Sequence, residues 1–301
     1  MTKIQAWLAL SRPPFHTVGV LPFILGTVLA YRTQGIFNFQ VLMLGTIGVI
    51  LIMLSTYYGG EYWDYVEDTL SARNKPSKFA GGSRVLQKGI LPRRAALSAS
   101  IASLSLALII GIVLQFVYRT GAWTLPFGVV GMLAGFFYSA RPVRWVRTGL
   151  GELLIALCYG WLPLAVSYYL QAGNIASLVH WMSIPVGLTI FNVILLNEYP
   201  DYDADRVAGK RNVLVRLGTK RGAYIYSIAG IGGLLFFFLS LYQGVPSRAL
   251  WLYLPVAAVS MVLTIMVLKG RWQDRDTLEK LCGANILVNL GTTASYILAF
   301  V

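Results

Sequence analysis

Long apolar segments alternate with short polar segments along the whole chain. Nine apolar runs come close to the roughly 17–25 residues that a helix needs to cross a bilayer. They lie at about 15–32, 38–58, 95–118, 122–140, 150–170, 179–196, 222–242, 249–268 and 281–301. The runs lack the alternation typical of barrel strands, and a helix satisfies its backbone hydrogen bonds within one segment. The pattern predicts an all-α, polytopic membrane protein built as a bundle of nine transmembrane helices.

The composition agrees with this fold class. Hydrophobic residues make up 56% of the chain and charged residues 12%, with a mean hydropathy of +0.65, whereas soluble domains have about 45–50% apolar and about 25% charged residues. No Ser/Pro/Gly-rich linker divides the chain, so we expect residues 1–301 to form a single transmembrane domain. The first run is too long for a cleaved signal peptide and should remain in the mature protein.

The basic residues are distributed very unevenly. The N-terminal tail and the loops at 59–94, 141–149, 197–221 and 269–280 hold 22 of the 25 Lys and Arg residues. Because cytoplasmic loops retain Lys and Arg, we expect a multi-pass protein of the cell (inner or plasma) membrane with its N-terminus in the cytoplasm and its C-terminus outside. The lipid bilayer is its expected environment, and we expect no nucleic-acid partner.

An eight-residue pattern, Glu-Tyr-x-Asp-Tyr-x-x-Asp, occurs twice, each time where an apolar run ends. We call residues 61–68 the first acidic motif and residues 198–205 the second; together they hold eight of the 12 acidic residues. If each motif is helical, the first, fourth and eighth residues share one face, whereas Glu67 and Asp203 point elsewhere. Pro200 predicts a kink or a restarted helix in the second motif.

Carboxylates on one face repel each other, and burial raises their pKa values unless a cation is present. Mg²⁺ binds oxygen ligands and is often shared between carboxylates and substrate phosphates. We therefore predict that the two motifs face each other across a cavity near the cytoplasmic face, with two Mg²⁺ ions and a diphosphate between them. The predicted metal ligands are Glu61, Asp64, Asp68, Glu198, Asp201 and Asp205, and the four aspartates are also predicted to be catalytic. A solvated helix end paired with Arg or Lys is the alternative.

Basic residues follow each acidic motif, and Gly81-Gly82-Ser83 lies close to the first. Lys and Arg neutralise phosphate oxygens, and a Gly-rich turn can direct backbone N–H groups at an anion. A flexible loop would explain the glycines equally well. The predicted diphosphate-binding residues are Arg12, Lys75, Lys78, Arg84, Lys210 and Arg211.

These motifs together resemble the UbiA superfamily of membrane prenyltransferases. The branch that prenylates 1,4-dihydroxy-2-naphthoate in menaquinone synthesis is the most similar. The strings that carry the resemblance are Ser11-Arg12-Pro13, Gly81-Gly82-Ser83, Thr148-Gly149-Leu150-Gly151-Glu152-Leu153, Asn197-Glu198-Tyr199-Pro200-Asp201, Ala208-Gly209-Lys210-Arg211 and Val215-Arg216-Leu217-Gly218. The family's first motif usually opens with Asn-Asp, where this chain has Gly60 and Glu61.

The resemblance implies Mg²⁺-dependent transfer of a polyprenyl group from an allylic diphosphate to an aromatic acceptor. Donor ionisation produces a carbocation that water would quench, so the site should exclude bulk solvent. Tyr138, Tyr199 and Asn197 are expected beside this cation, which aromatic faces attract, and Arg141 is expected to orient an acceptor carboxylate that leaves as CO₂.

Two alternatives remain open at this stage. Other acceptors used in the superfamily are 4-hydroxybenzoate, homogentisate, glycerol phosphate ethers and tetrapyrroles. A cation-coupled secondary transporter is the alternative from another class, although transporter sites lie near the bilayer midplane and these motifs lie at helix ends.

Overall fold

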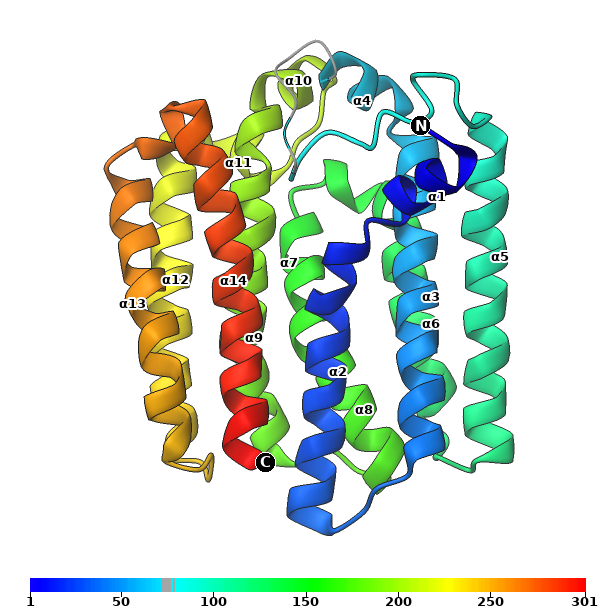
Figure 1. Cartoon of the computed structure of the whole chain (residues 1–301), viewed down its shortest axis with the longest axis vertical. Coiled ribbons are helices and arrows are strands. Elements are labelled where there is room, and N and C mark those ends of the chain that lie inside the picture. Colours follow the sequence, from blue (N-terminus) through cyan, green and yellow to red (C-terminus); the bar gives the residue numbers. More distant parts are fainter. Residues whose placement is uncertain (72–76, 78) are drawn as a thin grey trace.

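The computed structural model describes residues 1–71, 77 and 79–301, and that part of the chain contains helices and no strand. The long helices run side by side, and the short helices α1, α4 and α10 lie at the end of the bundle that carries the N-terminus (Figure 1). The α-helices are α1 (Lys3–Ser11), α2 (Pro13–Gln34), α3 (Phe39–Trp63), α4 (Tyr65–Ser71), α5 (Arg93–Ile112), α6 (Thr124–Ser139), α7 (Gly151–Ala156), α8 (Leu162–Ala172), α9 (Ser177–Asn197), α10 (Tyr202–Val207), α11 (Val213–Leu217), α12 (Thr219–Leu241), α13 (Arg248–Leu268) and α14 (Arg275–Phe300). The shorter turns are the π-helical η1 (Val113–Val117) and η3 (Leu157–Trp161) and the 3₁₀-helical η2 (Trp145–Arg147), η4 (Tyr199–Asp201) and η5 (Arg271–Gln273). The all-α prediction is confirmed.

In the described part of the chain, eight helical stretches are long and apolar enough to cross a membrane. They are Pro13–Gln34, Phe39–Trp63, Arg93–Val117, Gly151–Ala172, Ser177–Val207, Thr219–Leu241, Arg248–Leu268 and Arg275–Phe300. The run expected at 122–140 corresponds to α6, whose 16 residues fall just short of the roughly 17–25 that usually span a bilayer. The last stretch begins before the predicted residue 281, because Asp274 caps α14 by accepting a 2.9 Å hydrogen bond from the N–H of Thr277.

Small residues bring the helices around the centre of the bundle into close contact. A Cβ atom added at Gly160 in η3 would lie 2.4 Å from the Cα of Gly187 in α9, so the two backbones touch, as small residues permit between membrane helices. The ring of Phe237 in α12 stacks on those of Tyr253 in α13 and Tyr296 in α14, with centroid distances of 3.6 and 4.5 Å. These rings share a buried cluster with Val179, Met182 and Val186 of α9, the helix that leads directly into the second acidic motif.

Both acidic motifs interrupt the helix that precedes them. Asp64 has φ −93° and ψ 15°, so α3 ends there and α4 begins at the next residue. The first motif is thus helical on both sides of Asp64 but is divided there into the end of α3 and the start of α4. In the second motif α9 ends at Asn197, a 3₁₀ turn contains Pro200, and α10 restarts at Tyr202, which confirms the predicted effect of the proline.

The two termini lie at opposite ends of the bundle (Figure 1). Both acidic motifs lie at the end that carries the N-terminus, because α4 and α10 contact each other there.

Candidate active site

The two acidic motifs meet, as the sequence predicts. Ser71, the last residue of α4, donates a 2.5 Å hydrogen bond through its hydroxyl to Oδ1 of Asp201. A Cβ atom added at Gly81 would lie 2.6 Å from the Oγ of Ser71 and 3.3 Å from the Oδ1 of Asp201. The glycine loop therefore packs directly on the junction of the two motifs, at a φ of +62° that glycine adopts without strain.

Glu61 is enclosed by protein donors. Its side chain accepts hydrogen bonds from the backbone N–H of Ser83 at 2.7 Å, from the Ser83 hydroxyl at 2.9 Å and from the Arg12 guanidinium at 3.2 Å. Glu61 is 1% exposed and is not among the residues that line the cavity described below. It fastens the Gly81-Gly82-Ser83 loop to the end of α3, in addition to any role as a ligand.

Asp64 is held by side chains from α6 and from the loop that follows α6. The hydroxyl of Ser139, at the end of α6, donates to its Oδ2, and the guanidinium of Arg144 donates to its Oδ1 at 2.8 Å. These bonds link the turn between α3 and α4 to α6 and its following loop.

Within the described residues, Asp68 is the carboxylate of the first motif with the fewest contacts that neutralise its charge. Its Oδ1 accepts a 3.1 Å hydrogen bond from the N–H of Gly82, and a Cβ atom at Gly82 would lie 2.3 Å from its Oδ2. Burial, with added repulsion from Glu61 and Asp64, raises the pKa of Asp68 to about 8. A cation bound nearby would offset both effects, so this carboxyl group favours a positive ligand.

Glu67 points away from the cavity, as predicted from the helical spacing. It accepts hydrogen bonds from the guanidinium groups of Arg144, at 2.9 Å, and Arg147. Burial alone would raise the pKa of Glu67, but the backbone and these arginines hold it below its ordinary value. The pair of arginines joins α4 to the loop after α6.

In the second motif a lysine serves as the main counter-charge. Asp205 accepts hydrogen bonds from the ammonium of Lys210 at 2.8 Å and from the Asn212 amide at 3.1 Å. Burial would lower the pKa of Lys210, but Asp205 and Asp64 raise it above its ordinary value, so the lysine stays charged. Asp203 is exposed, which agrees with its predicted orientation away from the other carboxylates.

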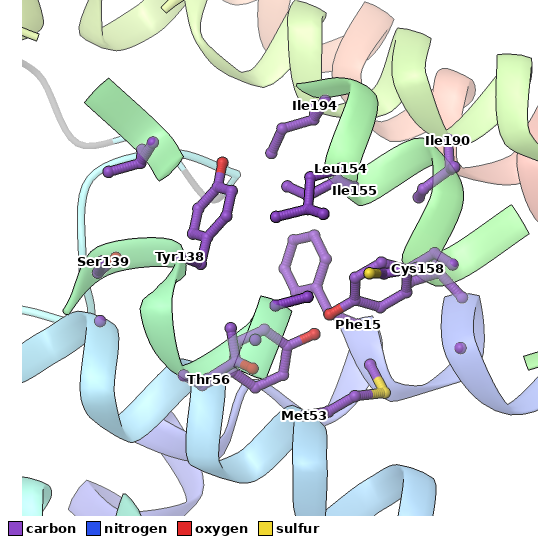
Figure 2. Close-up of a pocket in the computed structure, with 18 of the residues that line it drawn as sticks. Phe15, Met53, Thr56, Tyr138, Ser139, Leu154, Ile155, Cys158, Ile190 and Ile194 are labelled. Carbon is purple, nitrogen blue, oxygen red and sulfur yellow. The ribbon is translucent and has the colours of Figure 1, made fainter. Parts of the chain in front are cut away.

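A cavity of about 340 Å³ begins between the two motifs and continues into the bundle, a size within the range of small-molecule sites. Its charged end is formed by Arg12, Asp64, Asp68, Glu198, Asp201, Asp205 and Lys210. Beyond this end the lining is mainly apolar. Figure 2 shows Tyr138 and Ser139 on one side of the space and Cys158 and Ile190 on another, with Phe15 between them.

Most of the predicted site residues that the structure describes line this cavity. Besides the seven at the charged end, Tyr138 and Asn197 do so. Lys75 and Lys78 lie outside the described residues. Arg84, Arg141, Arg211 and Tyr199, like Glu61, are not part of the cavity lining.

Local structure explains these departures from the predicted site. Arg141 and Arg211 are exposed at the surface. Tyr199 donates its hydroxyl to the carbonyl of Thr219 at 2.8 Å, and its ring packs on Trp272 at a centroid distance of 5.0 Å. The 3₁₀ turn aims Tyr199 into the packing between α9 and α12, away from the cavity.

Ser71, Ser139 and Asn212 carry no sequence signal of their contacts with the motifs, because serine and asparagine are common at helix ends. Glu152 is different: it is 1% exposed and its Oε1 accepts a 2.5 Å hydrogen bond from the N–H of Val213 at the start of α11. A carboxyl group at the start of a membrane span is a functional signal by default. That signal was present in the sequence.

The carboxylate and amide oxygens at the charged end are suitable ligands for a hard divalent cation. Within the described residues, no three acidic, His or Cys side chains are close enough to form a ligand set by themselves. However, the Oε2 of Glu198 and the Oδ1 of Asn197 are buried and have no hydrogen-bond partner among the described residues. Carboxylate and amide oxygens are the ligands that Mg²⁺ prefers when substrate phosphates complete its shell, so the residues present fit such an ion.

A comparison with protein families shows to which family the chain belongs. The model of the UbiA prenyltransferase family matches residues 20–286. The chain belongs to the UbiA prenyltransferase family. It is thus a multi-pass membrane enzyme that transfers prenyl groups, and both acidic motifs lie within the matched region.

Two named relatives support the assignment of this chain to the UbiA family. The 1,4-dihydroxy-2-naphthoate octaprenyltransferase of Escherichia coli (strain K12) is 27% identical over 300 residues, which cover 96% of this chain and 94% of the relative. The 2-carboxy-1,4-naphthoquinone phytyltransferase of Synechocystis sp. is 27% identical over 228 residues, covering 75% and 70% of the two chains.

The fold agrees with solved structures of the same family. A UbiA homolog from Archaeoglobus fulgidus, bound to GPP and Mg²⁺, superposes with a TM-score of 0.68 at 16% sequence identity, covering 97% of this chain and 99% of that chain. The helical arrangement of this UbiA protein is therefore that of its family.

Proposed function

We propose that this UbiA protein transfers a polyprenyl group from an allylic polyprenyl diphosphate to 1,4-dihydroxy-2-naphthoate, in a Mg²⁺-dependent reaction of menaquinone biosynthesis. The observation that carries the proposal is the meeting of the two acidic motifs and Lys210 at the charged end of a largely apolar cavity. Such a cavity matches a ligand with an anionic head and a hydrocarbon tail.

Carboxylates from both motifs would hold the metal. Asp68 and Asp201 line the cavity next to the glycine loop, and the buried Oε2 of Glu198 accepts no hydrogen bond within the described residues. A divalent cation bound here supplies positive charge to the diphosphate oxygens that become more negative as the donor ionises. The solved relative bound to GPP and Mg²⁺ supports this choice of ion, and we expect two ions per site.

The protein's own cations would hold the diphosphate at the charged end. Lys210 and Arg12 both line the cavity and are the cavity-lining residues with fixed positive charge in the described part of the chain. Each is already paired with a carboxylate, Lys210 with Asp205 and Arg12 with Glu61, which keeps it in position before the substrate arrives. Charge that is positioned in advance stabilises a leaving anion without a cost of reorganisation.

The apolar part of the cavity would protect the allylic cation. The C–O bond of the donor breaks with its electron pair leaving on the diphosphate, and an electron-rich ring carbon of the acceptor attacks the allylic carbon. Tyr138 lines the cavity beside Ser139, which bonds to Asp64, and its ring is suited to face the cation. Apolar side chains such as Phe15, Leu154 and Ile155 line this part of the cavity and would limit the access of water to the cation.

The choice of acceptor rests on the relatives. Both curated relatives named above act, by their names, on naphthalene-derived acceptors. For a hydroxynaphthoate, attack on the prenyl cation is accompanied by loss of the carboxyl group as CO₂, and the ring recovers its aromatic electrons from the broken C–C bond. Other aromatic acceptors of the family are the alternative.

We also propose nine spans, with α6 as the ninth, and a charged end that faces the cytoplasm. The distribution of Lys and Arg supports this orientation, because the loops at the end that carries α4 and α10 are the basic ones. Protease protection of tagged termini in sealed vesicles would test it.

The function is tested with the purified protein in detergent, a radiolabelled polyprenyl diphosphate, Mg²⁺ and a panel of aromatic acceptors. We expect product with 1,4-dihydroxy-2-naphthoate, release of diphosphate and loss of both on chelation. Asp64→Ala and Asp201→Ala should abolish turnover in folded protein, while Asp203→Ala, at an exposed position, should retain it. Product with another acceptor and none with 1,4-dihydroxy-2-naphthoate would change the proposed acceptor. Activity in both Asp variants would contradict the proposed roles of the aspartates. Uptake of the substrate into liposomes without product would contradict the proposed prenyl transfer.

A further inference from the structure

One wall of the apolar part of the cavity is a glycine-rich face of α6. Gly128, Gly131 and Gly135 all line the cavity. Their spacing of three and four residues places them on one face of the helix. Ser139, which bonds to Asp64, ends the same helix at the charged side of the cavity. Because a helix rises about 1.5 Å per residue, Gly128 lies roughly 16 Å along the axis from this end.

The three glycines have different surroundings. A Cβ atom at Gly135 would lie 2.3 Å from the Oγ1 of Thr56, and one at Gly131 would lie 3.4 Å from the Cδ2 of Leu162. These two positions are small because α6 packs against α3 and α8. A Cβ atom at Gly128 would meet no atom within 4 Å. Packing does not explain this glycine, and its missing side chain adds open space to the cavity.

The neighbouring residue bounds the cavity at the same depth. Phe127 also lines it, and its ring makes edge contacts with Trp161 and Tyr169, with centroid distances of 6.2 and 5.6 Å. The hydroxyl of Tyr169 in turn accepts a 3.1 Å hydrogen bond from the N–H of Trp123. Contacts from two other elements thus fix the orientation of the Phe127 ring.

We propose that Gly128 and Phe127 set the length of the polyprenyl chain that the enzyme accepts, with Gly128 leaving room for the distal isoprene units and Phe127 forming the far wall. The inference rests on the proposed prenyl transfer. The diphosphate is held at Lys210 and Arg12, so a longer tail reaches further along α6. Substitutions near Gly128 therefore affect long donors and leave short ones unaffected.

The experiment measures kcat/KM for a series of allylic diphosphates of increasing isoprene number, with Mg²⁺ and one fixed acceptor. In Gly128→Phe we expect at least a tenfold loss for the longest donors and less than a twofold change for the shortest. Phe127→Ala should move the preference toward longer donors. Val130→Phe adds the same bulk to α6 at a position that is 48% exposed and should leave the length profile unchanged.

The possible outcomes separate this inference from the function. A wild-type enzyme that is inactive with every donor would remove the proposed function itself. An active wild type whose length profile is the same in Gly128→Phe and Phe127→Ala would overturn the length assignment alone, as would an equal loss for all donor lengths. Gly128→Ala is the second variant if Gly128→Phe fails to fold, because there is free space around the added Cβ. It should reduce the use of the longest donors. An unchanged length profile in Gly128→Ala would overturn the assignment.

Discussion

The hydroxyl of Ser71 donates to Oδ1 of Asp201 at 2.5 Å, across 130 residues of sequence. This bond fixes the distance between the two acidic motifs at the point where the glycine loop covers both. In the proposed reaction the two motifs hold one diphosphate together, so the bond should contribute to catalysis as well as to folding.

Ser71→Ala should therefore reduce kcat/KM for the donor by about tenfold, because a hydrogen bond to a charged group contributes about 1.5–3 kcal/mol. We expect the apparent Mg²⁺ affinity to fall as well, measured by titrating activity against the metal. Thr69→Ala is the matched control, since within the described residues the Thr69 hydroxyl donates to the Tyr65 carbonyl of the same helix, α4. Equal effects of the two substitutions would show that the bridge between motifs has no part in the reaction.

Lys210 should be required for donor binding. Its ammonium lies 2.8 Å from Asp205 and lines the cavity, so Lys210→Met removes the partly buried positive charge that is proposed to bind the diphosphate. We expect the donor KM to rise at least tenfold, with partial recovery in Lys210→Arg, in steady-state kinetics with varied donor. Arg206→Met removes an equal charge at an exposed position and should behave as wild type. An unchanged donor KM in Lys210→Met would exclude the proposed contact.

Glu67 should make part of the stability depend on pH. The backbone, Arg147 and Arg144 hold the pKa of Glu67 below its ordinary value. The ionised side chain therefore stabilises the fold at pH values above the unfolded pKa of about 4.3. This stabilisation is lost as the pH falls through the lower pKa of the folded state. Glu67→Gln should cost on the order of 1–3 kcal/mol at neutral pH, and this cost should become smaller as the pH falls below about 4.

Thermal unfolding of Glu67→Gln and wild type in detergent, compared between pH 7 and pH 3, measures this difference. Asp203→Asn, at an exposed carboxyl group, should show little difference from wild type over the same range. A gap between wild type and Glu67→Gln that stays constant with pH would contradict the assignment.

Gly160 should tolerate no side chain. An added Cβ would lie 2.4 Å from the Cα and 2.7 Å from the N of Gly187, and backbone atoms cannot move aside as a side chain can. We expect Gly160→Ala to destabilise the protein by about 1–3 kcal/mol, as overpacking does elsewhere. Gly48→Ala is the control, because its Cβ would meet only the Cγ2 of Ile110 at 3.5 Å. The midpoint of thermal unfolding in detergent distinguishes the two.

The sequence by itself determined the class of fold and the approximate spans, and it predicted a cation site. Hydropathy is a local property, and a segment in lipid must satisfy its own backbone, so each apolar run could be identified without knowledge of its neighbours. The duplicated acidic motif carried its meaning in the same way. Eight carboxylates at two helix ends predict a cation site before any contact between them is known.

Only the tertiary structure decided which of these groups face the cavity. Tyr199 and Lys210 follow the same helix, yet Tyr199 packs against Trp272 and Lys210 lies in the cavity. Ser139 and Arg144, which lie far from Asp64 in the sequence, bind its carboxylate. The space at Gly128 is open because no atom of another helix lies within 4 Å of an added Cβ. The physical reason is that burial and pairing depend on atoms distant in sequence, which local patterns do not record.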